Sequence, residues 1–444
     1  LQRDFNQPRG DILTADGKTA ATSEERRAAL RYQRVYPDGE LLSAVTGYYS
    51  FTLGSDGVER TYNEELAGRT PSLKLHRLSG FFSDTSSEGD VVLTVRKDLQ
   101  ETARDALGDR RGSVVALDPR TGAVLAMWSN PTFDPNLLSN NDAEAAAGAK
   151  ALYEAAPTKP LLPKAYRERY FPGSTFKVVT ATAGLTSGKV TVDSPTYPVV
   201  TSYTPPLTSK PISNFDGNAC GGTLLPILAR SCNSSFAQMA AETTGPDPMI
   251  DAAEAAGFNQ PVELDLPRPA RSVYPTDFGA VVSRPEGSAP VYEDTPKLAQ
   301  TAIGQNDVRA TPLQMAMVAA GAGNTGQIMA PHVMAEIRAR NGDVVEKFAP
   351  FPWKESMTPE VAATMREAMV GVVTDGTAAV MATPGWEVGA KTGTAQLGTK
   401  PPRSHGWMIA FAGQPGQPAQ VAVAVIVEDL PGVSAATGGS TAGP

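Results

Sequence analysis

The pattern of apolar and polar positions changes near residue 90 of this 444-residue chain. The stretch before it is polar and rich in Gly and Asp, and it offers only short strand-like pieces such as GYYSFTLG at 47–54. After it, an apolar run at 91–96 opens a series of longer periodic elements. We therefore predict a smaller N-terminal module over residues 1–90 and a larger domain over residues 91–444.

Helix and strand patterns alternate in the first part of the larger domain. Apolar residues at Leu99, Ala103 and Leu107 recur at helical spacing and predict an amphipathic helix. The next segment, GSVVALDPRTGAVLAMWSN, has two apolar runs around a turn in which Pro restricts φ and Gly supplies a positive φ. This segment predicts a β-hairpin at 113–128.

The remaining chain predicts helices enclosed by strands. The middle, about 145–385, is mostly helical in pattern, with interrupting loops rich in Pro, Ser and Thr at 191–215 and 265–297. Strand patterns return in AKTGTAQ, WMIAFAG and QVAVAVIVEDL. Because strands stand at both ends of a helical middle, we expect one sheet covered by helices, which is an α+β layered domain.

Charge and metal-ligating residues argue against two classes of function. The net charge of −8 and the pI of about 5.2 disfavour a nucleic-acid binder, which needs clustered Lys and Arg. His76, His332 and His405 are far apart, and Cys220 and Cys232 are too few for a Cys-rich zinc site. We therefore expect no metal ion and no cofactor.

No stretch of the sequence predicts a membrane span. The longest aliphatic run, VAVAVIV at 421–427, has seven residues, whereas a transmembrane helix needs about 20. The chain begins at Leu1 rather than Met, so an upstream anchor or signal segment is compatible with this sequence.

The stretch FPGSTFKVVTATAGL at 171–185 places a lysine among apolar residues, which is costly unless the lysine reaches solvent or is used. Ser174 and Lys177 stand three positions apart and share one helix face. Pro172 and Gly173 favour a helix start, where free N–H groups stabilise developing negative charge. Lys177 with a lowered pKa would activate Ser174 as a nucleophile. The alternative is a helix-capping serine beside a solvated lysine.

The segment LARSCNSSF carries Ser231, Cys232 and Asn233 after an apolar, helix-like run. At a polar tip between helices, the hydroxyl of Ser231 would relay a proton and the amide of Asn233 would bind a peptide group. The alternative is an ordinary polar loop, because a bare SxN pattern is common and SNN also occurs at 139–141.

The segment VGAKTGTAQ predicts a strand after a turn. Gly393 has no side chain, so the backbone of a ligand can approach this edge closely. Lys391, Thr392 and Thr394 offer a cation and two hydroxyls to a carboxylate, and an extended substrate would pair as an added strand. Lys391 is also the like charge that would lower the pKa of Lys177. The alternative is an ordinary edge strand.

The three patterns become specific through their order. SxxK, SxN and KTG begin at residues 174, 231 and 391, and each has its expected context of helix start, loop and strand. This set is typical of penicillin-binding proteins and β-lactamases, which form a serine acyl-enzyme.

The sequence resembles the class B penicillin-binding proteins, most closely the actinobacterial penicillin-binding protein A type. The similar segments, in family order, are PRGDIL, GVERTYNEELAGR, LDPRTGAVLAMWSNPTFDPN, YFPGSTFK, SCNSSFAQMA, IGQNDVRATPLQMAMVAAG, DGTA, AKTGTAQ and HGWMIAFAG. The resemblance implies a five-stranded antiparallel sheet flanked by helices, an all-helical lobe and a smaller non-catalytic N-terminal domain of the dimerisation or pedestal type. The chain stops at GGSTAGP, where the family usually continues into a C-terminal helix, so either the sequence is truncated before that helix or the helix is missing.

The resemblance also implies a function: an exported D,D-transpeptidase of peptidoglycan synthesis with a single-pass membrane anchor and an extracytoplasmic catalytic domain. Ser174 would attack the penultimate D-alanine of a stem peptide, Lys177 would be the base, and Ser231 would relay the proton. β-Lactams would acylate Ser174 as mimics of that substrate. The implied substrate-binding residues are Asn233, Lys391, Thr392, Gly393 and Thr394. The backbone N–H groups of Ser174 and Thr394 would form the oxyanion hole.

Two cysteines lie close to the SxN motif. Cys232 is inside it and Cys220 stands twelve residues earlier. In an exported protein two such cysteines often pair, so we expect a disulfide that braces this loop. The alternative is two buried thiols.

Three other functions remain open at this stage. A β-lactamase needs a group that hydrolyses its acyl-enzyme, and no Glu between 233 and 391 has Asn three residues on, as the class A signature requires. A D,D-carboxypeptidase differs only in its acceptor. A third possibility is a β-lactam sensor, or a scaffold that activates a membrane glycosyltransferase. From the resemblance we also expect the N-terminal module to dock a glycosyltransferase of the SEDS type.

Overall fold

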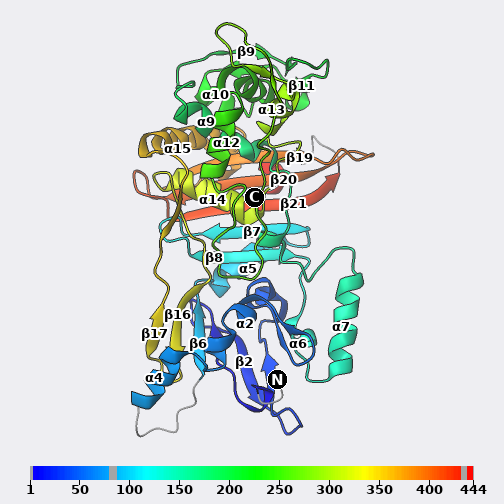
Figure 1. Cartoon of the computed structure of the whole chain (residues 1–444), viewed down its shortest axis with the longest axis vertical. Coiled ribbons are helices and arrows are strands. Elements are labelled where there is room, and N and C mark those ends of the chain that lie inside the picture. The colour runs from blue at the N-terminus through cyan, green and yellow to red at the C-terminus, as the bar shows by residue number, and fades with distance from the viewer. Residues whose placement is uncertain (1–3, 80–87, 432–437, 444) are drawn as a thin grey trace.

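The computed structural model describes residues 4–79, 88–431 and 438–443. Its long axis runs from an N-terminal sheet at one end, through a central sheet, to a helical lobe at the other end (Figure 1). Strands that precede and follow the mostly helical middle build the central sheet, as the hydrophobic pattern predicted.

The central layer is a five-stranded antiparallel sheet in the order β19-β20-β21-β7-β8. Its strands are β7 (Gly112–Leu117), β8 (Val124–Asn130), β19 (Glu387–Gln396), β20 (Arg403–Gly413) and β21 (Val421–Pro431). The predicted hairpin is β7–β8, and the three late strand patterns are β19, β20 and β21. This confirms the sheet that the family resemblance implied, and it leaves β19, the strand of the KTG motif, at one edge.

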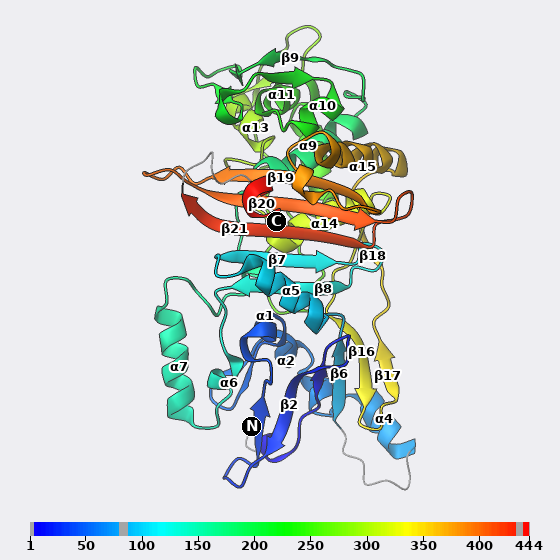
Figure 2. The same cartoon turned by 180° about the vertical axis from the view of Figure 1, so that it is seen from behind.

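Helices cover both faces of this sheet (Figures 1 and 2). Helix α14 (Pro312–Gly323) packs on β7, β20 and β21, and every one of its residues is buried. Helix α5 (Lys97–Leu107) covers β7 and β8 from the opposite face. Helix α15 (Pro359–Thr374) lies along β19. A short helix, α16 (Gly438–Thr441), contacts β19 and β20.

Helix α5 differs from its predicted apolar face at one position. Ala103 and Leu107 are buried, but Leu99 is 36% exposed and Gln100 is buried in its place. The side-chain amide of Gln100 donates hydrogen bonds to the carbonyl oxygens of Leu41 and Met127 and accepts one from the N–H of Met127. These backbone groups need partners inside the protein, so a polar side chain occupies the inward position.

The helical lobe consists mainly of short helices packed around the segment that holds the SxxK motif. They are η3 (Gly173–Phe176), α9 (Lys177–Thr186), α10 (Leu224–Ala229), α11 (Asn233–Gln238), the π-helical turn η5 (Met239–Thr244), α12 (Pro246–Ala255) and α13 (Thr295–Thr301). The two predicted loops also contain short strands. These are β9 (Tyr197–Val200), β10 (Ser202–Tyr203), β11 (Ile212–Ser213), β13 (Val281–Ser283) and β14 (Val291–Tyr292), and β9 pairs with β12 (Cys220–Gly222).

The N-terminal sheet has six strands in the order β17-β16-β6-β1-β2-β3. Four come from the start of the chain: β1 (Ile12–Leu13), β2 (Thr19–Glu25), β3 (Tyr32–Val35) and β6 (Gly89–Leu93). The other two, β16 (Met334–Ala339) and β17 (Val344–Lys347), form a hairpin from the segment predicted to be helical. Residues beyond 91 therefore complete the sheet of the module, and the division at residues 90 and 91 stays a prediction.

Further short elements complete the two ends of the molecule. In the N-terminal part these are η1 (Asp4–Asn6), η2 (Gly39–Leu42), α1 (Ser43–Thr46), β4 (Tyr49–Ser50), β5 (Gly54–Ser55), α2 (Gly57–Thr61), α3 (Asn63–Leu66) and α4 (Pro71–Ser79). Elsewhere they are α6 (Pro135–Leu138), α7 (Ala143–Ala155), α8 (Lys164–Arg167), η4 (Phe215–Gly217), β15 (Gln327–Met329), β18 (Pro352–Glu355) and η6 (Ala379–Met381).

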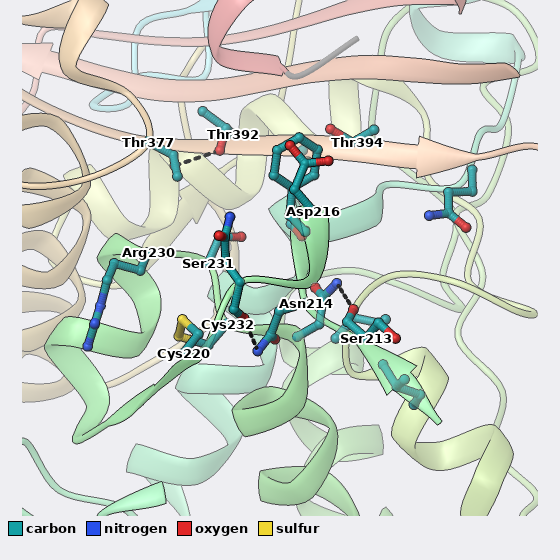
Figure 3. Close-up of a pocket in the computed structure, with 18 of the residues that line it drawn as sticks. Ser213, Asn214, Asp216, Cys220, Arg230, Ser231, Cys232, Thr377, Thr392 and Thr394 are labelled. Carbon is teal, nitrogen blue, oxygen red and sulfur yellow. Dashed lines mark hydrogen bonds between the residues drawn. A yellow bond between two sulfur atoms is a disulfide. The ribbon is translucent and has the colours of Figure 1, made fainter. Parts of the chain in front are cut away.

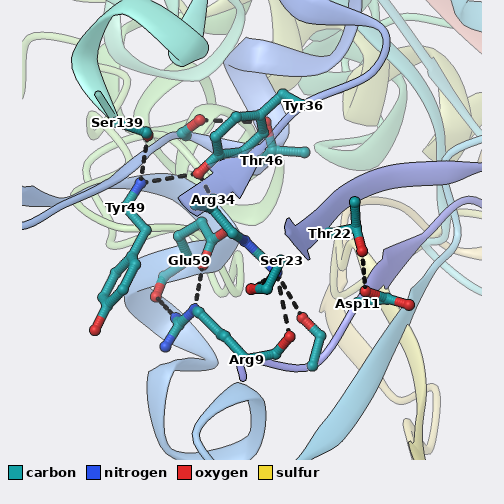
Figure 4. A network of polar contacts seen from close by, with 12 residues as sticks. Arg9, Asp11, Thr22, Ser23, Arg34, Tyr36, Thr46, Tyr49, Glu59 and Ser139 are labelled. Carbon is teal, nitrogen blue, oxygen red and sulfur yellow. Dashed lines mark hydrogen bonds and ion pairs between the residues drawn. The ribbon is translucent and has the colours of Figure 1, made fainter. Parts of the chain in front are cut away.

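A buried carboxylate joins two N-terminal segments that are distant in sequence (Figure 4). Glu59 is fully buried, and its two oxygens accept hydrogen bonds from Arg9 at 2.7 Å and Arg34 at 2.6 Å. The hydroxyl of Tyr36 also donates to Glu59. Burial alone would raise the pKa of Glu59, but the two guanidinium groups outweigh it and hold the pKa below its ordinary value. The segments PRGDIL and GVERTYNEELAGR thus meet in one ion-pair network.

Two polar contacts bind the N-terminal part to the rest of the chain. Asp56, at the start of α2, accepts two hydrogen bonds of 2.8 Å from the guanidinium of Arg167, which lies in α8. Tyr62 donates a 2.6 Å hydrogen bond to Asp265, whose carboxylate also accepts the N–H groups of Val333 and Met334. Since Met334 opens β16, this second contact lies where the chain passes from the central part to the N-terminal sheet.

Within residues 4–79, 88–431 and 438–443, no helix has the length and apolar character required to cross a membrane.

Candidate active site

The three sequence motifs meet in one groove between the helical lobe and the edge strand β19 (Figure 3). The groove has a volume of about 1280 Å³. Ser174 from η3, Ser231 and Asn233 from the turn between α10 and α11, and Thr392 and Thr394 from β19 all line it. The structure therefore brings together residues that the sequence separates widely.

Ser174 lies in a tight 3₁₀ turn immediately before helix α9 and is half-buried at the groove. The turn depends on Gly173, which has a φ of +54°, a conformation that costs a side-chain-bearing residue roughly 1–2 kcal/mol. A Cβ atom at this glycine would lie 2.7 Å from the carbonyl oxygen of Thr394. Gly173 therefore lets the turn of the expected nucleophile Ser174, residues 173–176 and called the nucleophile turn below, approach the backbone of β19.

Neighbouring backbone contacts hold this turn in place. The N–H of Gly173 donates to the carbonyl oxygen of Gly304 at 3.0 Å, and the indole N–H of Trp407 in β20 donates to the carbonyl oxygen of Phe171 at 3.0 Å. A Cβ at Gly304 would lie 2.1 Å from the carbonyl oxygen of Gly173, so only glycine fits there. The turn is thus held by hydrogen bonds from two sides, one with the central sheet and one with the segment after α13.

Lys177 is the first residue of α9 and is completely buried. Its Nζ atom donates to the carbonyl oxygen of Ser231 at 2.7 Å and to Oδ1 of Asn233 at 2.6 Å, and it lies 3.2 Å from Oγ of Ser231. Among the hydrogen bonds of the described residues, none joins Lys177 to the hydroxyl of Ser174. In this state the lysine is held by the SxN turn.

Lys391 approaches the same serine from the opposite side. It is completely buried in β19, and its Nζ atom donates to Oγ of Ser231 at 2.8 Å and to the carbonyl oxygen of Thr392 at 3.0 Å. Oγ of Ser231 is therefore the point at which two buried lysine side chains converge.

Burial sets the protonation of both lysines. It lowers the pKa of Lys177 well below its usual value, and the nearby charge of Lys391 lowers it further. Burial lowers the pKa of Lys391 to about 7. The electrostatic effect of Lys391 on Lys177 is the one predicted from the sequence, and it favours a neutral amine at Lys177.

The SxN turn is braced by covalent and polar contacts. Ser231 has a φ of +59° between the two helices, and the next residue, Cys232, forms a disulfide with Cys220. The side-chain amide nitrogen of Asn233 donates to the carbonyl oxygen of Ser213 at 2.9 Å. The turn is therefore tied both to β12 and to β11.

The edge strand β19 presents the KTG motif along the groove. Gly393 faces the nucleophile turn, and a Cβ there would lie 2.9 Å from Cγ2 of Thr175 and 3.0 Å from the carbonyl oxygen of Pro172. Oγ1 of Thr392 lies 2.7 Å from Oγ1 of Thr377 (Figure 3). Thr394 is half-buried at the groove wall.

Sequence reasoning did not assign several residues that shape the groove. Thr377 lies in the DGTA segment, which carried a similarity but no role. Asn214 and Asp216 sit in a polar loop without a distinctive pattern, although both line the groove. Gly304 and Trp407 act through backbone contacts with the nucleophile turn, which only coordinates reveal.

Comparisons with known proteins point to one family. Residues 112–444 match the penicillin binding protein transpeptidase domain, and residues 9–92 match the penicillin binding protein A dimerisation domain. The chain is 37% identical to the peptidoglycan D,D-transpeptidase PbpA of Mycolicibacterium smegmatis, with 100% of this chain and 88% of that protein covered. The PbpA of Mycobacterium tuberculosis strain H37Rv is 35% identical over the same shares.

Solved structures give the same result. The ceftriaxone acyl-enzyme complex of penicillin-binding protein A from M. tuberculosis superposes with a TM-score of 0.87 at 33% identity, covering 100% of this chain and 98% of that one. The imipenem acyl-enzyme complex of the same protein gives a TM-score of 0.87 at 32% identity, with the same coverage.

We predict that Gly173→Ala lowers thermal stability more than Gly188→Ala. Both glycines have a positive φ, but a Cβ at Gly188 meets no atom within 4 Å, whereas one at Gly173 meets the backbone of β19. Gly188→Ala therefore bears only the left-handed backbone cost of about 1–2 kcal/mol, and Gly173→Ala adds a steric clash. The midpoint of thermal unfolding measures both. Equal shifts in the two variants would contradict the close approach of the turn to β19.

Proposed function

This chain belongs to the class B penicillin-binding protein transpeptidases of the PbpA type, and from that premise we propose how its groove carries out the reaction. The protein is a peptidoglycan D,D-transpeptidase of the serine acyltransferase kind. The observation that best supports a catalytic assignment of residues is the convergence of Lys177 and Lys391 on Oγ of Ser231, in the groove that Ser174 lines.

The contacts of Lys177 suit a general base. A neutral lysine amine has two N–H bonds and one lone pair. The carbonyl oxygen of Ser231 and Oδ1 of Asn233 lie at 2.7 and 2.6 Å and accept both N–H bonds. The lone pair of the Lys177 amine is then available to accept a proton. A positioned base of this kind contributes roughly 10²- to 10⁴-fold in rate.

Acylation follows from these positions. Oγ of Ser174 attacks the carbonyl carbon of the penultimate D-alanine of the donor stem peptide while its proton passes to Lys177. The carbon–nitrogen bond to the terminal D-alanine then breaks, and the proton travels from Lys177 through the hydroxyl of Ser231 to the leaving amine. The products of this half-reaction are an ester on Ser174 and free D-alanine.

Deacylation reverses the proton path with a different amine. The amine of a neighbouring stem peptide attacks the ester, a carbon–nitrogen bond forms, and the bond from carbon to Oγ of Ser174 breaks. The proton lost by the amine returns to Oγ of Ser174 through Lys177. β-Lactams acylate Ser174 in place of the donor. The structures of the M. tuberculosis relative with ceftriaxone and imipenem are named as acyl-enzyme complexes.

We assign the binding roles to the groove walls. Lys391 and the hydroxyls of Thr392 and Thr394 hold the terminal carboxylate of the donor, and Asn233 binds its peptide group. The backbone N–H groups of Ser174 and Thr394 form the oxyanion hole. Support comes from the glycines: Gly173 and Gly393 bring the nucleophile turn and β19 together. Loss of one such donor costs about 3–4 kcal/mol of transition-state stabilisation in well-studied hydrolases.

We also propose that the catalytic domain works outside the cytoplasm, attached to the cell membrane by a single anchor. Its support is the disulfide between Cys220 and Cys232, because disulfides persist in oxidising compartments. From the family resemblance alone, we also propose that the N-terminal module docks a glycosyltransferase of the SEDS type.

The first test is labelling with fluorescent penicillin. We predict that the wild type takes up one label per chain and that Ser174→Ala takes up none. Ser187→Ala, in which the lost hydroxyl bonds only the carbonyl oxygen of Gly184 in α9, is the matched control and labels like the wild type. Label that persists on Ser174→Ala would refute the nucleophile. Rapid turnover of nitrocefin by the wild type would indicate a β-lactamase instead.

The second test is the pH dependence of acylation. Below about pH 7 Lys391 is charged, so its charge opposes protonation of Lys177 and lowers the pKa of Lys177. Lys391→Met removes that charge but leaves burial, so the pKa of Lys177 rises part of the way toward its usual value. We predict that the half-maximal pH of the acylation rate moves upward. Lys189→Met, outside the groove, leaves it in place. A downward or absent shift in Lys391→Met would contradict the base assignment.

The third test concerns the partner. Leu75 in α4 is 70% exposed on the N-terminal module, and Val380 in η6, which packs on α15 of the transpeptidase domain, is 54% exposed. We predict that a photo-crosslinking residue at position 75 captures the SEDS-type glycosyltransferase in cells and that one at position 380 does not. Capture from both positions, or only from position 380, would remove the support for docking through the module.

A further inference from the structure

One wall of the groove is a short loop that is braced on both sides. The segment runs from Pro211 to Ala219 and begins with β11, which pairs with β10. Within it, the buried amide of Asn214 donates to the carbonyl oxygens of Val200 and Asn218 at 2.8 and 3.1 Å. Its Oδ1 accepts the N–H of Ser234 at 2.8 Å. The disulfide at Cys220 anchors the far end, so the loop holds a defined position beside the SxN turn.

Asp216 stands at the tip of this loop. Its backbone adopts φ 50° and ψ 22°, a left-handed conformation that aspartate tolerates better than most residues. The residue is exposed and lines the groove. In Figure 3 its carboxylate points toward the strand that carries Thr392 and Thr394.

The carboxylate of Asp216 differs from the other charged groups at the groove surface. Among the described residues it has no hydrogen bond and no ion pair. Asp375 across the groove accepts a 2.8 Å hydrogen bond from the hydroxyl of Thr374, and Arg230 donates to the carbonyl oxygen of Gly221 at 2.7 Å. Asp216 therefore presents an uncompensated negative charge to whatever enters.

The reaction needs two substrates of opposite terminal charge. The donor ends in a carboxylate, whose binding we assigned above to Lys391, Thr392 and Thr394. The acceptor supplies a primary amine, which is an ammonium ion at neutral pH. An ammonium that enters beside a carboxylate is attracted to it, most strongly at low ionic strength.

We propose that Asp216 is the residue that binds the ammonium group of the acceptor stem peptide at the mouth of the groove. This inference rests on the proposed transpeptidase function. Asp216 holds the cation and takes no proton: the ammonium releases its proton to water before the free amine attacks the ester. The bonds made and broken at Ser174 are those of deacylation described above.

The test compares how acyl-enzyme partitions between acceptor and water. The donor is a benzoyl-D-alanyl thioester, which contains no amine, and the acceptor is D-alanine amide, which contains no carboxylate. The intact chain is used, and active-site titration with fluorescent penicillin normalises each preparation. Asp216→Asn is compared with Asp193→Asn, which removes an equally exposed carboxylate from the same lobe outside the groove.

We expect Asp216→Asn to raise the acceptor concentration at half-maximal aminolysis by about two- to fivefold, a size typical of a solvent-exposed ion pair. Added salt narrows the difference from the wild type, and Asp193→Asn behaves like the wild type. An unchanged acceptor requirement in Asp216→Asn, or an equal rise in Asp193→Asn, would overturn the proposal.

A second arm separates the two possible sources of an amine. Donors that end in lysyl-D-alanyl-D-alanine are compared with the lysine ε-amine free and acetylated, and D-alanine release reports acylation. If Asp216→Asn slows only the free-amine donor and leaves acceptor partitioning intact, the acceptor assignment is wrong. A wild type that forms no acyl-enzyme would instead refute the transpeptidase function itself, so the two failures are distinguishable.

Discussion

Two completely buried lysine side chains meet at one serine hydroxyl, and the rest of the site is built around that arrangement. Removing an ammonium group from water costs several kcal/mol even after the protein relaxes. The structure lowers this cost by lowering the pKa of Lys177 and Lys391, and by giving their N–H bonds oxygen acceptors at 2.6–3.0 Å. A lysine in this state is held in place and reactive at the same time.

That arrangement requires three elements that are distant in sequence to keep fixed relative positions. Lys177 begins a helix buried in the lobe, Lys391 lies on an edge strand, and Ser231 sits in a left-handed turn between two helices. A shift of any one element would break the convergence. The disulfide at Cys232 and the close contact of Gly173 with β19 restrict such shifts, because the first ties the turn to β12 and the second joins lobe and sheet without an intervening side chain.

The sequence predicted the elements near the candidate active site better than the elements far from it. The hairpin β7–β8, the three late strands and the start of α9 follow from local patterns of apolar residues and turn residues. The hairpin β16–β17 was missed because its strands are short and their partner, β6, lies more than 200 positions earlier in the chain. Gln100 replaced Leu99 on the inner face of α5 because carbonyl groups from remote segments need donors there, which periodicity cannot register. Three motif patterns indicated which residues belong to the site. The attachment of Lys177 to Asn233 rather than to Ser174 required coordinates.

The hairpin β16–β17 also determines when the N-terminal sheet can be completed during synthesis of the chain. Strand β6 pairs with β1 on one side and with β16 on the other. During synthesis residues 89–93 emerge long before residues 334–347, so the edge of β6 that pairs with β16 stays open until β16 is made. Open edges are sites of wrong pairing. The N-terminal sheet therefore reaches its final form only after most of the transpeptidase domain has been made, and until then β6 has one edge without its native partner strand.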